Sequence, residues 1–263
     1  MIKKNDYTKT PSFYNSDEVF MKYLGKTSYY LSLQPAVSKI VSLSKPNKLI
    51  DIGFGTGSTT VRLSEENPHS SIKAIDMRED MVKLLSSKAK DLGLNNIETI
   101  CDDMCHYINK STEIHDAIIM VYSFHHICDP LHKKNKFLMD CYNKLNTKGI
   151  IIIGETFIPE EADSLTDTQT LANLWKLREE EAYGATFWNT LMGLDEDSIE
   201  FCRNVANFSK HYETKAGELV SIRSDEYLVK KSWLVYNAER IGFSILINES
   251  INCVGESVIV LKK

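Results

Sequence analysis

The stretch Lys48-Leu-Ile-Asp-Ile-Gly-Phe-Gly-Thr-Gly-Ser-Thr-Thr60 decides the fold of this 263-residue chain. Its first residues are apolar and mostly β-branched, as a strand buried on both faces requires. Gly53, Gly55 and Gly57 then occupy every second position, which permits a tight turn and lets a ligand lie directly against backbone. The hydroxyl residues 58–60 are typical of a helix start. Together these features predict a nucleotide-type crevice at the carboxyl end of a parallel strand.

The spacing of the glycines narrows the choice of nucleotide. A dinucleotide fingerprint, Gly-x-Gly-x-x-Gly, does not fit, because its last position is Ser58 counted from Gly53 and Thr60 counted from Gly55. Asp51-x-Gly-x-Gly-x-Gly instead resembles the first motif of the class I S-adenosylmethionine (SAM)-dependent methyltransferases. The resemblance implies that Asp51 and the glycines 53, 55 and 57 hold the methionine portion of SAM as cofactor. The alternative is a plain glycine-rich turn beside an incidental aspartate.

A second acidic residue follows the next expected strand, 71–75. Asp76 stands 19 residues after Gly57, at the distance from which a carboxylate accepts both ribose hydroxyls. The segment after it also resembles the family's second motif, which implies that Met77 touches adenine. The alternative is that Asp76 caps the helix expected over 78–89, and both roles are compatible.

The third expected strand, 96–101, is again followed by acids. The resemblance implies an aspartate near the adenine amino group at this position. The length of the strand favours Asp103 for that role, with Asp102 as the alternative, and Met104 as an adjacent backbone or apolar contact. Val121, which ends the fourth expected strand, is a further expected cofactor contact.

A histidine pair follows the fourth expected strand, 117–121, in the segment Tyr-Ser-Phe-His-His-Ile-Cys-Asp-Pro. This segment resembles the corresponding loop of small-molecule methyltransferases. His125, and after it His126, could act as a general base because imidazole titrates near neutral pH. Glu155, after the fifth expected strand, is the next catalytic candidate. The alternative is that the histidines only hold the loop, and no metal is expected here.

Strands and helices alternate over residues 48–155, which predicts an α/β fold with a doubly wound, mostly parallel sheet. The resemblance implies a seven-stranded, Rossmann-like methyltransferase sheet completed by a C-terminal hairpin, 243–247 with 257–261. The other expected elements are a fifth strand over 150–153 after a turn at 146–149, and helices over 18–30, 35–43, 134–145 and 226–241, the last ended by Gly242.

Two segments lie outside this alternating core and are expected to cover it. Aromatic residues in both are expected to bind the acceptor: Tyr14, Tyr29, Trp175, Tyr183 and Trp188. The alternatives are a helix packed on the sheet edge for the first segment, and a packing layer or dimer surface for the second. The expected division is an N-terminal helical lid (1–46), a SAM-binding core (47–155), a helical cap insertion (156–225) and a C-terminal helix and hairpin (226–263).

Composition narrows the class of function. The net charge of −5 without a basic block argues against a nucleic-acid partner, and no apolar run approaches a membrane helix. The six cysteines form no disulfide framework, and the first residues do not resemble a signal peptide, so a cytoplasmic monomer or homodimer is expected. The expected activity is SAM-dependent methyl transfer to a nitrogen, oxygen or carbon atom of a small molecule. The alternatives are aminocarboxypropyl transfer or cyclisation of SAM, which release methylthioadenosine, and a non-catalytic subunit.

Overall fold

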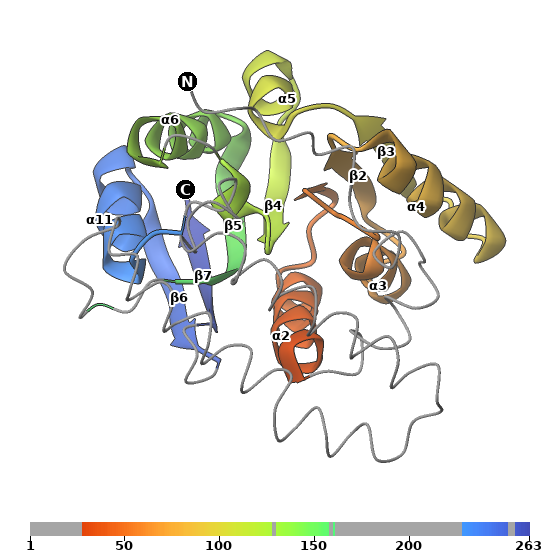
Figure 1. Ribbon diagram of the computed structural model, residues 1–263, viewed down its shortest axis with the longest axis horizontal. Helices are drawn as coiled ribbons and strands as arrows, with labels where there is room; N and C mark the ends of the chain where they lie inside the picture. Colours follow the sequence, from red (N-terminus) through yellow and green to blue (C-terminus); the bar gives the residue numbers. More distant parts are fainter. Residues whose placement is uncertain (1–27, 128–129, 158–159, 161–227, 252–255) are drawn as a thin grey trace, which may run out of the picture.

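The computed structural model describes residues 28–127, 130–157, 160, 228–251 and 256–263. The seven strands of this part form one sheet in the order β3-β2-β1-β4-β5-β7-β6, as Figure 1 shows. Neighbouring strands are parallel except at β7, which is antiparallel to both β5 and β6. The predicted fold class is therefore confirmed. The strands are β1 (Lys48–Ile52), β2 (Ser71–Asp76), β3 (Ile97–Cys101), β4 (His115–Val121), β5 (Leu145–Thr156), β6 (Ser244–Ser250) and β7 (Glu256–Lys262).

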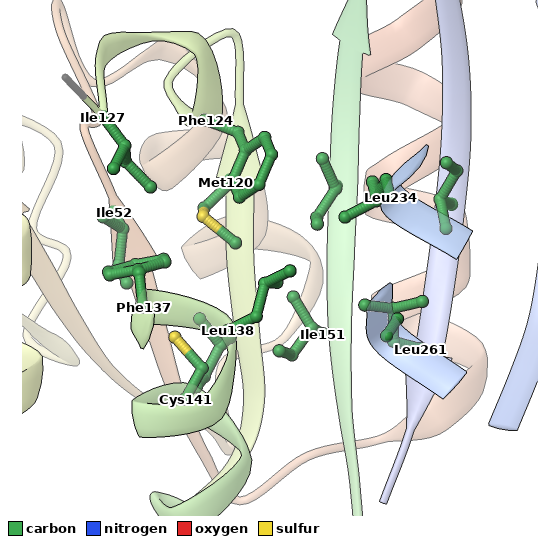
Figure 2. Packing of buried hydrophobic residues seen from close by; sticks show 14 of the residues in the cluster. Ile52, Met120, Phe124, Ile127, Phe137, Leu138, Cys141, Ile151, Leu234 and Leu261 are labelled. Carbon is green, nitrogen blue, oxygen red and sulfur yellow. The ribbon is translucent and has the colours of Figure 1, made fainter. Parts of the chain in front are cut away.

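Helices cover both faces of the sheet, because its central strands are apolar on both sides. One core packs α5 (Met104–Lys110), α6 (Pro130–Asn143) and α11 (Lys231–Ile241) against one face; Figure 2 shows the α6 and α11 part of it. The opposite face is covered by α2 (Ser28–Ser44), α3 (Ser58–Glu66) and α4 (Glu79–Asp91). The order of the strands reverses at β1 and β4, so their carboxyl ends form the usual ligand crevice of such a sheet.

Helix α2 differs from the expected pair of helices. It runs unbroken from Ser28 to Ser44 with Pro35 inside it, whereas the sequence predicted a helix that begins at residue 35. Its buried side chains, Leu33, Val37 and Val41, recur every four residues, so the packing of one face outweighs the missing proline N–H. Leu33 and Val37 also approach so closely that a Cβ at Gly154 would lie 3.2–3.3 Å from them. This helix therefore lies directly on β5.

Three other expected boundaries were wrong. The turn expected at 146–149 lies within β5, where the pairing with β4 shifts register between His115 and Ala117. An irregular strand and a turn share the same polar composition there, so the pattern did not separate them. Helix α6 begins at Pro130 rather than 134, because proline suits the first turn of a helix. Helix α11 begins at Lys231 and ends, as predicted, at Gly242 with φ 116°.

Most of the predicted lid and cap lies outside the described residues, and so do Tyr14, Trp175, Tyr183 and Trp188. Tyr29 lies in the first turn of α2, but its side chain is also outside the description. The division into lid, core, cap and C-terminal hairpin therefore stays a prediction. Within the described ranges, the helices are all too short or too polar to cross a bilayer.

Candidate active site

The glycine turn after β1 is shaped by close packing at its ends. A Cβ at Gly53 would lie 2.5 Å from the Cβ of Ser123, and one at Gly57 would lie 2.6 Å from Cδ1 of Leu85. A side chain at Gly53 would require Ser123 to move, and one at Gly57 would require the Leu85 side chain to move. Gly55 has φ 56°, and a Cβ there would meet no atom of the described residues within 4 Å. The turn is therefore packed at both ends and open in the middle, where a ligand can lie against the backbone.

Asp76, at the end of β2, braces this open turn. Its Oδ2 accepts from the backbone N–H of Gly55 at 2.9 Å, and its Oδ1 accepts from the N–H of Arg78 at 2.9 Å. Each carboxylate oxygen has a second lone pair, so the group can still accept two ligand hydroxyls. Burial raises the pKa of the Asp76 carboxyl, and the two N–H donors oppose that rise. The proposed helix cap was wrong: α4 begins at Glu79, and its capping residue is Arg78.

Asp51 lies deeper than Asp76 and contacts the protein itself. Only 1% of its surface is exposed, and Thr60 Oγ1 in the first turn of α3 donates to its Oδ2 at 2.6 Å. Burial raises the pKa of Asp51 to about 6; the Thr60 hydrogen bond opposes the rise, and the nearby charge of Asp76 adds to it. Asp51 thus ties β1 to α3, and its contact with a cofactor stays a prediction.

Both acids after β3 contact His106, one through its backbone and the other through its ring. Asp103 caps α5, because its Oδ1 accepts from the backbone N–H of His106 at 2.9 Å. Asp102 pairs with the same residue through Nδ1 of the imidazole at 2.8 Å. Asp103 is exposed, whereas Asp102 is half-buried. A cap uses one oxygen, so Asp103 keeps acceptor sites for a ligand amino group.

The other expected cofactor contacts flank the glycine turn or lie behind it. Met104 approaches the turn, since a Cβ at Gly53 would lie 3.8 Å from its Cε. Met77, beside Asp76, is 60% exposed and can be covered by a ligand. Val121 ends β4 and packs against the core on the α2 side of the sheet. Their contacts with adenine or ribose remain predictions.

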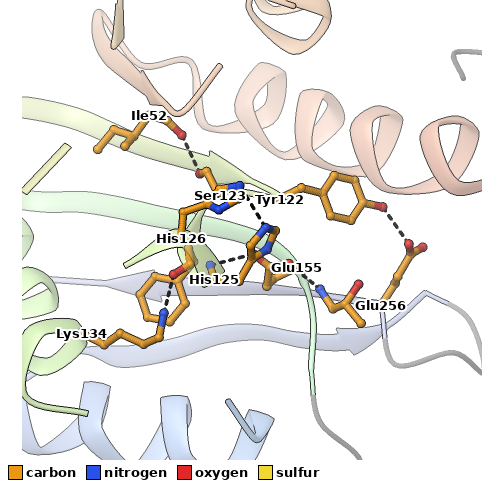
Figure 3. Close-up of polar contacts among 10 residues, drawn as sticks. Ile52, Tyr122, Ser123, His125, His126, Lys134, Glu155 and Glu256 are labelled. Atoms are coloured by element: carbon orange, nitrogen blue, oxygen red, sulfur yellow. Dashed lines mark hydrogen bonds and ion pairs between the residues drawn. The ribbon is translucent and has the colours of Figure 1, made fainter. Parts of the chain in front are cut away.

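The predicted histidine pair forms a chain of contacts with Glu155, shown in Figure 3. Oε2 of Glu155 accepts from the backbone N–H of His125 at 3.2 Å and lies 2.9 Å from its Nδ1. When Glu155 is ionised, Nδ1 must carry the proton, which leaves Nε2 of His125 as an acceptor. That Nε2 lies 3.2 Å from Nε2 of His126. We call Glu155, His125 and His126 the relay.

The three residues of the relay differ in their exposure to solvent. Glu155 is 2% exposed and His125 is 6% exposed, whereas His126 is exposed. The sequence left two interpretations open, a base or a prop for the loop. The contact with Glu155 orients the ring as a base requires and also supports the loop, so the geometry is compatible with both.

Two hydrogen bonds that the sequence did not predict hold in place the loop that carries His125 and His126. Ser123 Oγ donates to the carbonyl of Ile52 in β1 at 2.6 Å, and Lys134 Nζ donates to the carbonyl of Phe124 at 2.6 Å. Lys134 is fully buried and its ammonium lies 4.5 Å from the centre of the Phe124 ring. Lys134 lies three residues before the apolar Phe137, and this helical spacing could have indicated from the sequence that Lys134 faces inward.

A further polar contact was missed because its partners lie far apart in the chain. The hydroxyl of Tyr122, the first residue after β4, donates to Oε1 of Glu256 in β7 at 2.9 Å. Glu256 is fully buried, and Tyr122 has the left-handed φ of 52°, which is rare for a bulky residue. The available signal was the alternation of Glu256 with Val258 and Val260, which places it on an inward face.

The sequence is similar to proteins named as methyltransferases and as carboxy-S-adenosyl-L-methionine synthases. Residues 49–149 match the profile of a methyltransferase-domain family. The chain is 30% identical over 118 residues to a carboxy-S-adenosyl-L-methionine synthase of Nautilia profundicola, covering 45% of this chain and 48% of that protein. It is 26% identical over 166 residues to a caffeic acid 3-O-methyltransferase of Zinnia elegans, covering 62% and 43%. The chain thus spans about half the length of such curated relatives.

Solved structures of methyltransferases have a similar fold. An O-methyltransferase family protein from Burkholderia thailandensis superposes with a TM-score of 0.61 at 11% identity, covering 95% of this chain and 58% of that one. At this identity the likeness concerns the fold alone.

Proposed function

The chain carries a methyltransferase domain of the class I SAM-dependent family, and on that premise we propose that it methylates a hydroxyl group of a small molecule. The relay is the observation that carries the choice of a hydroxyl acceptor. A hydroxyl must lose its proton when it is methylated, and the relay offers an imidazole oriented by a buried carboxylate. His125 and His126 follow β4, and Glu155 lies near the end of β5. Ser123, two residues before His125, donates to the carbonyl of Ile52 and packs against Gly53 at the start of the glycine turn.

The residues around the turn fit the cofactor of this family. When bound, SAM supplies an electrophilic methyl group on its sulfonium sulfur. The open face of Gly55 leaves room for a ligand against the backbone, and Asp76 keeps two acceptor sites of the kind that a ribose needs. The cofactor contacts that we propose are Asp76 for the ribose, Met77, Asp103, Met104 and Val121 around the adenosine, and Asp51 with Gly53, Gly55 and Gly57 for the methionine portion.

The relay gives the removed proton a defined path. Nε2 of His125 receives the proton of the acceptor, and Glu155, at Nδ1 of the same ring, stabilises the resulting imidazolium. His126 is exposed, so the proton can pass from it to solvent. Catalysis otherwise needs the acceptor oxygen to be held in line with the methyl group and away from water.

A second candidate chemistry comes from the relatives named as carboxy-SAM synthases, one of which is 30% identical to this chain over 118 residues. Such an activity would modify SAM itself and would leave no methylated acceptor. Transfer of the aminocarboxypropyl group and cyclisation of SAM are further possibilities on the same fold. Aminocarboxypropyl transfer and cyclisation both release methylthioadenosine, whereas methyl transfer releases S-adenosylhomocysteine.

Product analysis separates the candidates. The full chain is incubated with SAM and a panel of phenols and catechols, and the products are identified and quantified by mass spectrometry. We expect S-adenosylhomocysteine and a methyl ether in equal amounts, greatly reduced in Glu155→Gln and unchanged in Glu239→Gln, an exposed control on α11. Methylthioadenosine, or a SAM molecule that has gained a carboxyl group, would refute methyl transfer.

A further inference from the structure

Two polar clusters stand at the carboxyl edge of the sheet, on opposite faces. Along β5 the side chains alternate, so Glu155 follows Ile153 on the α6 and α11 face. Thr156 follows Ile152 on the α2 face, and Glu256 pairs with Thr156 directly across the β5–β7 ladder. Residues paired in this way point to the same face. The relay thus uses one face of the edge, and Thr156 and Glu256 share the other.

The second cluster comprises Tyr122, Thr156 and Glu256, and we call it the acidic subsite. Tyr122 packs against the core on the α2 side, and its hydroxyl donates to Oε1 of Glu256 at 2.9 Å. The left-handed backbone of Tyr122, held by its N–H to the carbonyl of Gly154 at 2.9 Å, turns the chain between the fourth strand and Ser123. Tyr122 is also only three residues before His125, so both clusters border the same edge.

Thr156 supplies the independent sign of a ligand. Its side chain is 1% exposed, and its Oγ1 makes no hydrogen bond within the described part of the chain. A buried hydroxyl without a partner is unfavourable, and a bound polar molecule that supplies the missing hydrogen bond accounts for its presence. Its neighbour across the ladder is the buried carboxylate of Glu256.

We propose that the acidic subsite binds a protonated amine of the acceptor, an inference that rests on the proposed methyl transfer to a small molecule. An ammonium group has three N–H donors, and the subsite offers three kinds of acceptor: the Glu256 carboxylate, the Thr156 hydroxyl and the phenolic oxygen of Tyr122. An acceptor that carries a carboxylate, as caffeic acid does in the relative named after it, would meet a like charge here. The acidic subsite therefore selects amine-bearing acceptors and rejects acidic ones.

Three related phenols test the charge preference: 4-ethylphenol is the shared skeleton, to which tyramine adds an ammonium group and 3-(4-hydroxyphenyl)propionate adds a carboxylate. Their binding to the full chain saturated with S-adenosylhomocysteine is measured by calorimetry. We expect tyramine to bind about tenfold or more tightly than 4-ethylphenol, the effect of a charge-assisted hydrogen bond, and the propionate to bind most weakly. Glu256→Gln should abolish the preference, Thr156→Val should reduce it, and the exposed control Glu239→Gln should leave it intact.

The outcomes separate this inference from the proposed function. Equal binding of tyramine and 4-ethylphenol, a preference that survives in Glu256→Gln, or binding of none of the three phenols would overturn the acidic subsite. If Glu256→Gln does not fold, as judged by its thermal unfolding, Thr156→Val and Tyr122→Phe carry the test through the same preference ratio. A tyramine preference without S-adenosylhomocysteine formation from SAM would support the subsite and refute the proposed reaction.

Discussion

Replacement of Asp51 by asparagine should stabilise the folded protein in a pH-dependent way. Burial raises the pKa of Asp51 to about 6 from the ordinary 3.8, which means that folding favours the protonated carboxyl. The stability associated with this group is therefore fully present below pH 3.8 and is lost as the pH rises through about 6. At 1.36 kcal/mol per pH unit, the interval corresponds to about 3 kcal/mol. The neutral amide of the Asp51→Asn variant cannot ionise and would not show this loss.

The assay is urea unfolding followed by circular dichroism, for wild type and Asp51→Asn, at intervals from pH 4 to pH 8. The difference in the free energy of unfolding should grow in favour of Asp51→Asn across that range and level off above pH 7. Asp91→Asn, on the exposed end of α4, serves as the control for general charge effects. A difference that is constant with pH, or that favours wild type more strongly at high pH, would show that folding does not raise the pKa of Asp51.

Three further predictions concern the cofactor turn and the relay. Asp76→Ala should weaken SAM binding by about 1.5–3 kcal/mol; unchanged affinity in calorimetry would remove Asp76 from the site. His125→Ala should lower kcat by about 10²–10⁴-fold and remove an ionisation from the pH–rate profile, with SAM affinity retained; loss of affinity and thermal stability together would instead indicate a prop. Gly57→Ala should destabilise the fold by about 1–3 kcal/mol, because its Cβ would collide with Leu85. Gly55→Ala should leave thermal stability closer to wild type but reduce SAM binding, and the opposite order of the two variants would contradict the open turn.

The sequence predicted the parts of the fold that depend on local pattern. Apolar strands, the first three of which are followed by a glycine turn or acids, are visible without any structure. Their alternation with helices predicted a doubly wound, mostly parallel sheet, and the resemblance to the methyltransferases implied its antiparallel C-terminal hairpin. The ends of helices and strands were harder to predict where two structural preferences compete. At Pro35 the apolar spacing of α2 outweighs the proline, and at 146–149 a polar segment belongs to an irregular strand rather than to a turn.

The sequence predicted which residues belong to the candidate site, but not which of them contact one another. His125 was identified from its position after a strand, yet its contact with Glu155 spans 30 residues, and its contact with His126 depends on the direction of two neighbouring rings. Tyr122 and Glu256 lie 134 residues apart, so only the closing of the sheet by β7 brings them together. Spacing along a chain carries no information about such contacts, which arise from tertiary packing.

The brace between Asp76 and Gly55 has a kinetic and thermodynamic consequence. Hydrogen bonds within the protein hold the turn after β1 to the end of β2, so the conformational entropy of ordering that turn is lost during folding rather than during association. Ligand capture at this edge should accordingly approach a rigid-body encounter, whose rate depends on diffusion and orientation instead of on loop closure. The heat-capacity change of SAM association should then reflect the apolar surface that SAM itself buries, with little contribution from coupled folding.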